Sequence, residues 1–312
     1  MALFRKSVST AGLSLGTGSL RYIELGGSPG DLAVSISSRL PIEGTAIEQE
    51  MIADVHSLEA HLLRMKESLG GRWADAVVIG MPSRDVLLRI VEMPAMDESD
   101  AREALKWDFD KYFPFPYFDA TYDLGLINAP GEGAPDSARY VVAASRLHVV
   151  NSLLDTARRA GIRVAAVEPV NVALYRCAWG GGSRAAEGTM VVSVGKNSSQ
   201  IAVGFGGDGV LYRTLLVGGE PLPGPGAPFA PISREVSSTF TYLGSQFREM
   251  KVDEIILAGE YADRAELNEA IEAVTAVPVA VSDPWKEWGI VGAPEERAGW
   301  EAALGLALRS LS

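Results

Sequence analysis

The stretch "LSLGTGSLRYIEL" at residues 13–25 decides the fold, because a second copy, "VSVGKNSSQIAVG", stands at residues 192–204. In each copy a short apolar strand runs into a turn of small and hydroxyl residues and then into another strand. A Gly-rich turn and a third strand follow both times. Two unrelated hairpins can look alike, but a match over three successive strands favours an internal duplication. We therefore predict two similar halves, each opening with a β-meander.

The turn of the first copy has the chemistry of an anion site. Gly16, Thr17, Gly18 and Ser19 offer backbone N–H groups and two hydroxyls, which together can cradle a phosphate. A loop that also held a metal–phosphate pair would normally carry a carboxylate at Ser14. The first hairpin is therefore either a nucleotide site or the remnant of one.

Composition and charge exclude several functions. The chain has 312 residues, enough for two domains, and a net charge of −12 from 40 acidic and 28 basic side chains. A nucleic-acid surface needs clustered Lys and Arg, so we expect no nucleic-acid partner. No apolar run is long enough to span a bilayer, and the start lacks the apolar region of a secretory signal. Cys177 lies in an apolar stretch, which favours a buried thiol, and the histidines lack metal-ligand spacing.

Strands alternate with helices along the rest of the chain. Residues 45–69 read as one amphipathic helix that opens with a capping box from Thr45 to Glu48. Two strands that end at proline follow, and then an acid-capped helix over residues 97–113. The Gly/Ser/Ala segment 179–188 is typical of a linker. This alternation predicts α/β sheets covered by helices.

These segments together resemble the actin, Hsp70 and sugar-kinase superfamily, and within it the PilM family of type IV pilus machines. Beyond the two hairpins, the resemblance rests on a collinear set of segments that covers essentially the whole chain. They are "VEMPAMDESDAREALKWDFDKYFPFP" (91–116), "YVVAASR" (140–146), "AGIRVAAVEPVNVALYR" (160–176), "LYRTLLVGG" (211–219), "SREVSSTFTYL" (233–243), "IILAGE" (255–260) and "ALGLALR" (303–309).

The resemblance implies an α/β, duplicated actin/Hsp70-like two-lobe fold with ribonuclease-H-like halves and a small inserted α+β subdomain in lobe 1. Lobe 1 would span residues 1–178, with the inserted subdomain at about 80–146. The linker 179–188 would lead to lobe 2 at 189–295, and a C-terminal helix at 296–312 would pack back on lobe 1.

The resemblance also implies an adaptor role. PilM-like proteins bind the short cytoplasmic N-terminal tail of PilN, a single-pass membrane protein, in a groove on lobe 1. They couple the inner-membrane pilus platform to cytoplasmic motor proteins. We therefore expect a cytoplasmic protein that is peripheral to the inner membrane through a PilN-like partner, without direct membrane insertion.

The chain departs from the family pattern where a nucleotide would bind. The family carries Asp at the positions of Ser14 and Ser193, and a neutral hydroxyl cannot balance the charge of Mg²⁺. Glu260 replaces a family glycine and would put negative charge near the nucleotide, whereas Lys196 adds positive charge. We expect ATP binding to be weak or lost, no Mg²⁺ and no catalytic residues. The candidate nucleotide-binding residues are Ser14, Gly16, Thr17, Gly18, Ser19, Ser193, Gly195, Lys196, Asn197, Ser198, Gly218, Gly219, Glu235, Gly259 and Glu260.

Two alternatives to the adaptor are an active ATPase or small-molecule kinase of the superfamily, and the cytoplasmic domain of the type II secretion protein GspL. The enzyme would need a carboxylate beside the hairpins, and the acids nearest in sequence, Glu24, Asp31 and Asp208, are too far along the chain to substitute. A GspL-like chain would continue into a transmembrane helix, and this chain ends without one.

Segments outside the hairpins also have two interpretations each. The aromatic stretch "KYFPFPYF" (111–118) is a docking edge or, as we favour, a plug that holds the inserted subdomain on lobe 1. Trp107 is predicted to lie off the buried stripe of its helix, where an exposed contact with a partner is one interpretation of it. The Gly/Pro loop 218–231 is interpreted as a flexible connection at a cleft edge, and a direct binding role is its alternative. The last helix has few cations, which favours packing on lobe 1 over binding to a membrane surface.

Overall fold

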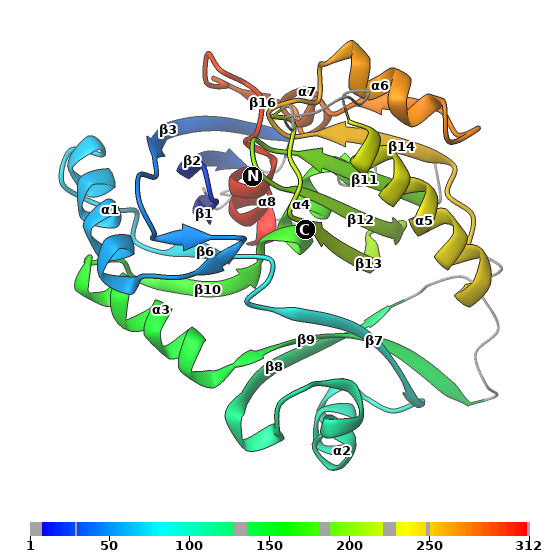
Figure 1. The fold of residues 1–312 in the computed structure, drawn as a ribbon. Helices are drawn as coiled ribbons and strands as arrows, with labels where there is room; N and C mark the ends of the chain where they lie inside the picture. The colour runs from blue at the N-terminus through cyan, green and yellow to red at the C-terminus, as the bar shows by residue number, and fades with distance from the viewer. Residues whose placement is uncertain are drawn as a thin grey trace, which may run out of the picture. The chain divides into compact units, whose positions relative to one another are not determined.

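The computed structural model describes residues 8–28, 30–127, 136–180, 188–220, 229–247 and 250–310. Contacts divide the chain into two units (Figure 1). Unit 1 comprises Met1–Pro82, Ser152–Arg184 and Ser282–Ser312, and unit 2 comprises Ser83–Asn151 and Ala185–Val281. The predicted lobe limits stay predictions. Most of the linker 179–188 and of the loop 218–231 lies outside the described residues.

Unit 1 is built on a mixed sheet with the strand order β10-β6-β1-β2-β3-β16. An antiparallel meander forms its centre, and two further strands run parallel to the first strand of the meander. The strands are β1 (Val8–Leu15), β2 (Ser19–Ser28), β3 (Asp31–Pro41), β6 (Val77–Met81), β10 (Val164–Pro169) and β16 (Ile290–Val291). Because β1, β6 and β10 are parallel, the turn after β1 lies at the edge where all three strands end.

Unit 2 repeats this arrangement with the strand order β13-β12-β11-β14-β15. The strands are β11 (Gly188–Val194), β12 (Ser199–Phe205), β13 (Asp208–Leu215), β14 (Glu254–Ala258) and β15 (Val279–Val281). The register repeats as well: Ser14 lies opposite Arg21 in unit 1, and Ser193 lies opposite Gln200 in unit 2. The predicted duplication is therefore confirmed.

Helices cover both faces of the first sheet. α1 (Val55–Ser68) and α3 (Leu147–Arg159) pack on the face that carries Leu13 and Leu15. α4 (Val170–Trp179), the short α7 (Pro284–Glu287) and α8 (Glu301–Ala307) pack on the face that carries Ile23 and Leu25. Cys177 of α4 is fully buried there, and burial raises the pKa of its thiol, so the predicted buried thiol is confirmed.

The prediction of one helix over residues 45–69 is wrong in its first part. The chain instead forms a small hairpin of β4 (Ile47–Glu48) and β5 (Met51–Ile52), and α1 begins after it. The backbone N–H groups of Ala53 and Asp54 both donate to the carbonyl of Ala46, which closes the segment. Ala46 and Ile47 are buried in the core beneath the sheet, so tertiary burial overrides the local helical pattern.

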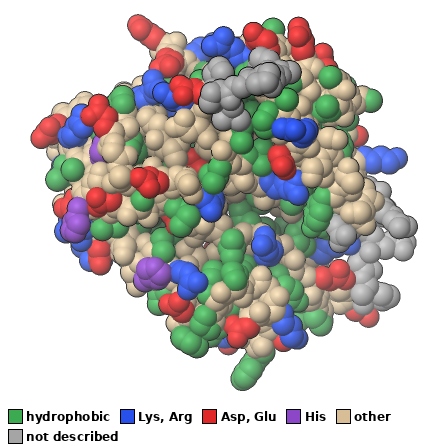
Figure 2. Space-filling model, in the orientation of Figure 1, with side chains coloured by type: hydrophobic (Ala, Val, Ile, Leu, Met, Phe, Trp, Pro, Cys, Tyr) green, Lys and Arg blue, Asp and Glu red, His purple; other side chains and the backbone are tan. Residues whose placement is uncertain are grey.

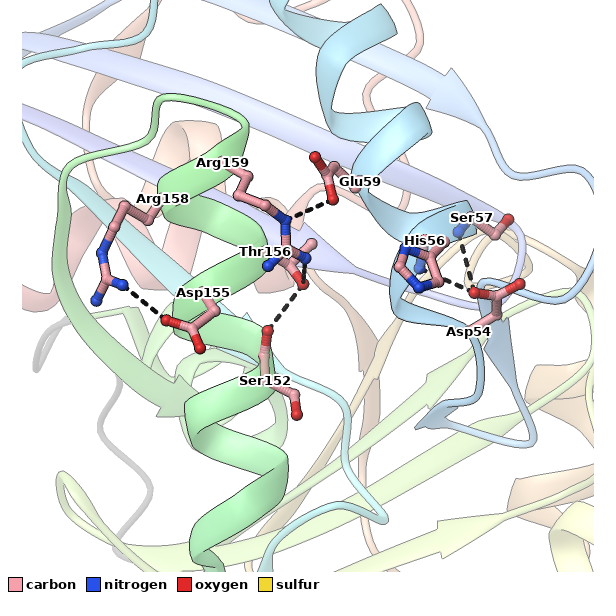
Figure 3. A network of polar contacts seen from close by, with 9 residues as sticks. All are labelled: Asp54, His56, Ser57, Glu59, Ser152, Asp155, Thr156, Arg158 and Arg159. Atoms are coloured by element: carbon pink, nitrogen blue, oxygen red, sulfur yellow. Dashed lines mark hydrogen bonds and ion pairs between the residues drawn. The ribbon is translucent and has the colours of Figure 1, made fainter.

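The true cap of α1 is Asp54 rather than Thr45 (Figure 3). Its Oδ1 accepts hydrogen bonds from the backbone N–H groups of His56 (2.8 Å) and Ser57 (3.1 Å). Farther along the helix, Glu59 Oε2 accepts a hydrogen bond of 2.7 Å from Arg159 Nε, which ties α1 to α3 (Figure 3). An aspartate cap stabilises a helix start by about 1 kcal/mol, so the chain has a strong start signal at this later position.

Unit 2 also contains the segment between β6 and α3. It forms a sheet with the order β7-β9-β8 and one main helix over it. Its elements are β7 (Leu87–Pro94), α2 (Glu98–Tyr112), the 3-10 turn Tyr117–Asp119, β8 (Ala120–Ile127) and β9 (Ser137–Arg146). α2 covers one face of this sheet, and Ile90 and Val141 on the other face join the core under β13. α5 (Ala230–Gln246) and α6 (Ala265–Glu272) pack in that same core.

The aromatic stretch 111–118 divides between core and surface. Phe113 and Phe115 are buried around Phe109 in the core of the inserted segment, whose members all lie between Leu87 and Ala144. The prediction that these rings hold the inserted subdomain on lobe 1 is therefore wrong. The rings instead fill the space between α2 and its own sheet. Phe118 is 81% exposed, and Trp107 is 90% exposed, as predicted. Figure 2 shows hydrophobic side chains gathered over this segment.

None of the helices in the described part of the chain is long and apolar enough to cross a membrane.

Candidate functional site

The first candidate element is the hairpin between β1 and β2. The backbone N–H of Gly16 donates to the carbonyl of Ser19 at 3.2 Å, which closes the predicted tight turn. Ser14 and Ser19 are buried at 6% and 2% exposure, and Thr17 is half-buried. Within the described residues, the Ser19 hydroxyl has no hydrogen-bond partner. This hydroxyl is thus buried at the start of β2, and Thr17 is the more accessible hydroxyl of the turn.

A carboxylate that the sequence analysis missed lies against this turn. Glu50, at the tip of the β4–β5 hairpin, is buried at 4% exposure. Thr17 Oγ1 donates a hydrogen bond of 3.1 Å to Glu50 Oε1. On the other side of the turn, the backbone N–H of Ile42 donates to the carbonyl of Gly18 at 3.2 Å. Glu50 therefore contacts the first hairpin turn directly, and the sequence analysis named only Glu24 and Asp31 for this hairpin.

A second carboxylate lies in the same cross-strand row as Ser14. Glu168 on β10 pairs with Gly80 on β6, and Gly80 pairs with Ser14 on β1. Two strand spacings separate the backbones of Glu168 and Ser14 by about 10 Å. The carboxylate is held by Arg176 of α4 through hydrogen bonds of 2.9 and 2.5 Å, so it is already neutralised within unit 1.

The second hairpin repeats the geometry of the first. The backbone N–H of Gly195 donates to the carbonyl of Ser198 at 3.0 Å, and Ser193 is half-buried. Lys196 and Asn197 form the exposed tip of the turn. The structure thus places all the candidates of this hairpin together, as predicted.

The segment after β13 lies directly on this second turn. The backbone N–H groups of Gly219 and Glu220 donate to the carbonyls of Gly195 (2.8 Å) and Lys196 (3.2 Å). A Cβ at Gly218 would come within 2.1 Å of the Lys196 carbonyl oxygen, so only glycine fits this approach. The candidate pair Gly218 and Gly219 therefore serves to close the backbone over the hairpin.

The positive charge of the second hairpin is matched by acids. Lys196 Nζ lies 3.1 Å from Glu220 Oε1, and both side chains are half-exposed. The hydrogen bond and charge of Glu220 raise the pKa of Lys196, and Glu260 adds to the same effect. That Glu260 puts negative charge near a nucleotide stays a prediction. Glu220 is a residue that the sequence analysis did not single out.

Gly259 and Tyr261 complete the neighbourhood of the second hairpin. Gly259 has a φ of +88°, and a Cβ there would lie 2.6 Å from the carbonyl oxygen of Val194. The backbone N–H of Tyr261 donates to that same carbonyl at 3.1 Å. The ring of Tyr261 lies against Gly219, where a Cβ would come within 2.3 Å of it. The "LAGEY" segment is thus held against the turn by backbone geometry.

One candidate has a different environment. Glu235 lies on α5, and its Oε2 is 3.6 Å from Arg213 Nη1 on β13. Arg213 also donates to Thr239 one turn farther along α5, at 3.0 Å. Glu235 therefore has an ion pair that fastens α5 to the sheet. Whether any candidate contacts a nucleotide stays a prediction. The described part of the chain holds no cluster of three or more His, Cys, Asp and Glu side chains suited to a metal ion.

The sequence indicates the positions of Glu50 and Glu220 only weakly. Glu50 follows Gln49 in a stretch whose Glu and Gln residues favour helix, and a two-residue hairpin turn is usually marked by Asn-Gly or Asp-Gly. Glu220 is the residue directly after Gly218 and Gly219, so its place at the turn follows once that segment is docked. Only the folded chain shows that both carboxylates contact a hairpin.

The chain is similar to the solved PilM-PilN type IV pilus biogenesis complex, with 20% identity and a TM-score of 0.78 over 98% of this chain and 99% of that chain. It is also similar to the cytoplasmic domain of EpsL, an inner-membrane component of the type II secretion system of Vibrio cholerae (10% identity, TM-score 0.51, 96% and 95% covered). A third likeness is to the ethanolamine utilization protein EutJ from Carboxydothermus hydrogenoformans (11% identity, TM-score 0.50, 96% and 89% covered).

These likenesses show the fold, a mixed α/β, two-lobe actin-like fold, as the sequence predicts. A family model described as "Type IV pilus assembly protein PilM" matches residues 12–223, which is more than half of the chain. The protein therefore belongs to the type IV pilus assembly protein PilM family.

Proposed function

We propose that this chain is a cytoplasmic adaptor of a type IV pilus assembly machine and binds the N-terminal tail of a PilN-like inner-membrane protein. The observation that carries the proposal is the full-length likeness to a chain of a PilM–PilN complex. The adaptor would be peripheral to the inner membrane through this partner, and other platform or motor proteins of the machine would bind elsewhere on it.

Charge supports this pairing. The chain carries a net charge of −12, with 40 acidic against 28 basic side chains. The cytoplasmic flank of a membrane-spanning helix is enriched in Lys and Arg, so the tail of a single-pass inner-membrane protein is expected to be basic. Opposite charges steer such partners together and make their association sensitive to salt.

The test is a binding titration with a fluorescent peptide that carries the N-terminal tail of the PilN-like protein from the same organism. We expect saturable binding, measured by fluorescence anisotropy, that weakens as salt is raised. A peptide of the same composition in scrambled order is the matched control. Equal binding of both peptides, or no binding of the native one, contradicts the adaptor proposal.

We also propose that the nucleotide function of the fold is degenerate. Mg²⁺ is usually held by one or two carboxylates together with phosphate oxygens, and both hairpins carry serine at the position in question. The acids that adjoin the hairpins have other tasks: Glu50 accepts from Thr17, and Glu220 pairs with Lys196. The residues present therefore do not fit a Mg²⁺–nucleotide complex.

The alternative, an active ATPase or small-molecule kinase, is separated by melting temperatures with and without millimolar Mg-ATP. A ligand at 100 times its dissociation constant stabilises a protein by about 2.7 kcal/mol, or roughly 5–10 °C for domains of this size. We expect no shift in the wild type. A shift of that size refutes the degenerate site, and a shift found only after Ser14→Asp with Ser193→Asp assigns the loss to the two serines.

A further inference from the structure

The β4–β5 turn has an unusual backbone. Gln49 and Glu50 have φ values of +47° and +60°, the left-handed region that side chains other than glycine and asparagine rarely adopt. Two consecutive residues of this kind make a strained turn, and such strain persists only where the surrounding structure holds it. Here Ile47 is buried at 3% exposure, and Ile52 packs against the same core. The strained turn therefore has a fixed place beside the sheet.

The strained turn places the side chain of Glu50 against the first hairpin turn. Glu50 is 4% exposed, although a buried carboxylate is costly without groups that stabilise its charge. One such group is the Thr17 hydroxyl, at 3.1 Å in the middle of the first hairpin turn. Turns of this kind, with successive backbone N–H groups and hydroxyls, are suited to bind the oxygens of an anion. A carboxylate is itself an anion with two acceptor oxygens.

We propose that Glu50 is a built-in anion of the first hairpin, which engages Thr17 in place of a phosphate and excludes phosphate groups from the turn. The proposal deepens the proposed loss of nucleotide binding, on which it rests. The Thr17 hydroxyl is a donor that a phosphate would need on entry, and Glu50 already accepts its hydrogen bond. A phosphate entering the turn meets the charge of Glu50 at close range.

The size of this effect follows from electrostatics. Two like charges about 4 Å apart near a protein surface repel each other enough to weaken binding by roughly a thousandfold. Removal of the carboxylate charge removes this repulsion and frees the Thr17 hydroxyl. Glu50→Gly does both and also suits the positive φ, whereas Glu50→Gln removes the charge and keeps the shape.

The experiment is calorimetric titration of the full chain with inorganic pyrophosphate, without metal. We expect Glu50→Gly and Glu50→Gln to bind pyrophosphate at least about tenfold more tightly than the wild type. Glu48→Gln removes a charge from the same small hairpin at an exposed position and should leave the affinity at the wild-type value. Adding Thr17→Val to Glu50→Gly should abolish the gain.

The proposal is overturned if neither Glu50 variant gains affinity, if Glu48→Gln gains as much, or if the wild type already binds as tightly as Glu50→Gly. Glycine tolerates the backbone of residue 50, so Glu50→Gly tests the idea even where the glutamine variant folds poorly. Binding of the PilN-like tail peptide is measured on the same variants. In our proposal, tail binding does not depend on Glu50. If the wild type does not bind the tail peptide, the adaptor role is refuted, and the role of Glu50 is still decided by the pyrophosphate titrations.

Discussion

Replacing Arg176 by methionine should destabilise unit 1 by about 3 kcal/mol, because the change leaves a buried carboxylate without its main partner. The side chains of Arg176 and Glu168 are 17% and 8% exposed, and two hydrogen bonds of 2.9 and 2.5 Å join them. Arg176 also donates to the carbonyl of Gly305 on α8, at 3.0 Å. Loss of one partner of a buried pair costs about 3–5 kcal/mol. Arg309, at 3.7 Å from Glu168, remains as a weaker partner, which favours the low end of this range.

The assay is calorimetric unfolding, in which about 3 kcal/mol corresponds to a fall in melting temperature of about 6–12 °C for a unit of this size. The double variant Arg176→Met with Glu168→Leu should recover most of the loss, with a coupling energy of at least about 2 kcal/mol. Arg158→Met, which breaks the exposed pair with Asp155, is the control and should cost less than about 0.5 kcal/mol. A cost below about 1 kcal/mol for Arg176→Met, or no coupling in the double variant, refutes the reasoning.

Three further outcomes follow from packing and ionisation. Gly305→Ala should destabilise the protein by more than about 2 kcal/mol, because the added Cβ would lie 1.9 Å from a carbonyl oxygen of α4. Gly244→Ala, at an exposed position in the last turn of α5, should stabilise it by about 0.5–1 kcal/mol, and urea unfolding measures both changes. Phe109→Ala should cost about 3–5 kcal/mol and Trp107→Ala less than about 0.5 kcal/mol in the same assay, because the two side chains are 1% and 90% exposed. Burial and a hydrogen bond to Glu24 raise the pKa of Tyr22, so the folded state keeps this proton at a pH where the unfolded state has lost it. The free energy of unfolding should therefore fall as the pH rises above about 10. Tyr22→Phe should flatten this alkaline slope, and an unchanged slope would count against the assignment.

The proposed role of Glu50 would allow the fold to lose nucleotide binding without any change in its scaffold. The strand order and register of the hairpins are the same in both units, so the scaffold that presents each turn is intact. In our proposal, the two turns differ from a nucleotide site in the charge brought to them, by Glu50 in unit 1 and by Glu220 and Glu260 in unit 2. Loss of anion binding therefore requires no change in the strands that hold the core together.

Local patterns in the sequence determined most of the architecture. The duplicated hairpins, the alternation of strands and helices and the cap of α2 at Asp97 depend on residues close together in the chain, so the pattern reports them directly. The exposure of Trp107 followed in the same way from its place between the buried Leu105 and Phe109 on one helix. Gly218 and Gly219 are candidates for nucleotide binding from the family resemblance, which stays a prediction, and their close backbone approach to the second turn is visible only in the structure.

Only the tertiary structure decided the start of α1 and the charges at the two turns. Glutamate and glutamine favour helix in isolation, so residues 45–54 read as the first turns of a helix until the burial of Ala46 and Ile47 is known. That burial draws the segment into a strained hairpin and places Glu50 against Thr17, more than 30 positions away in the chain. The ion pair of Glu168 with Arg176 is equally invisible in a linear pattern until β10 and α4 pack, since it depends on where side chains point in space. The sequence by itself thus determined the frame, and the packing of distant segments decided its chemistry.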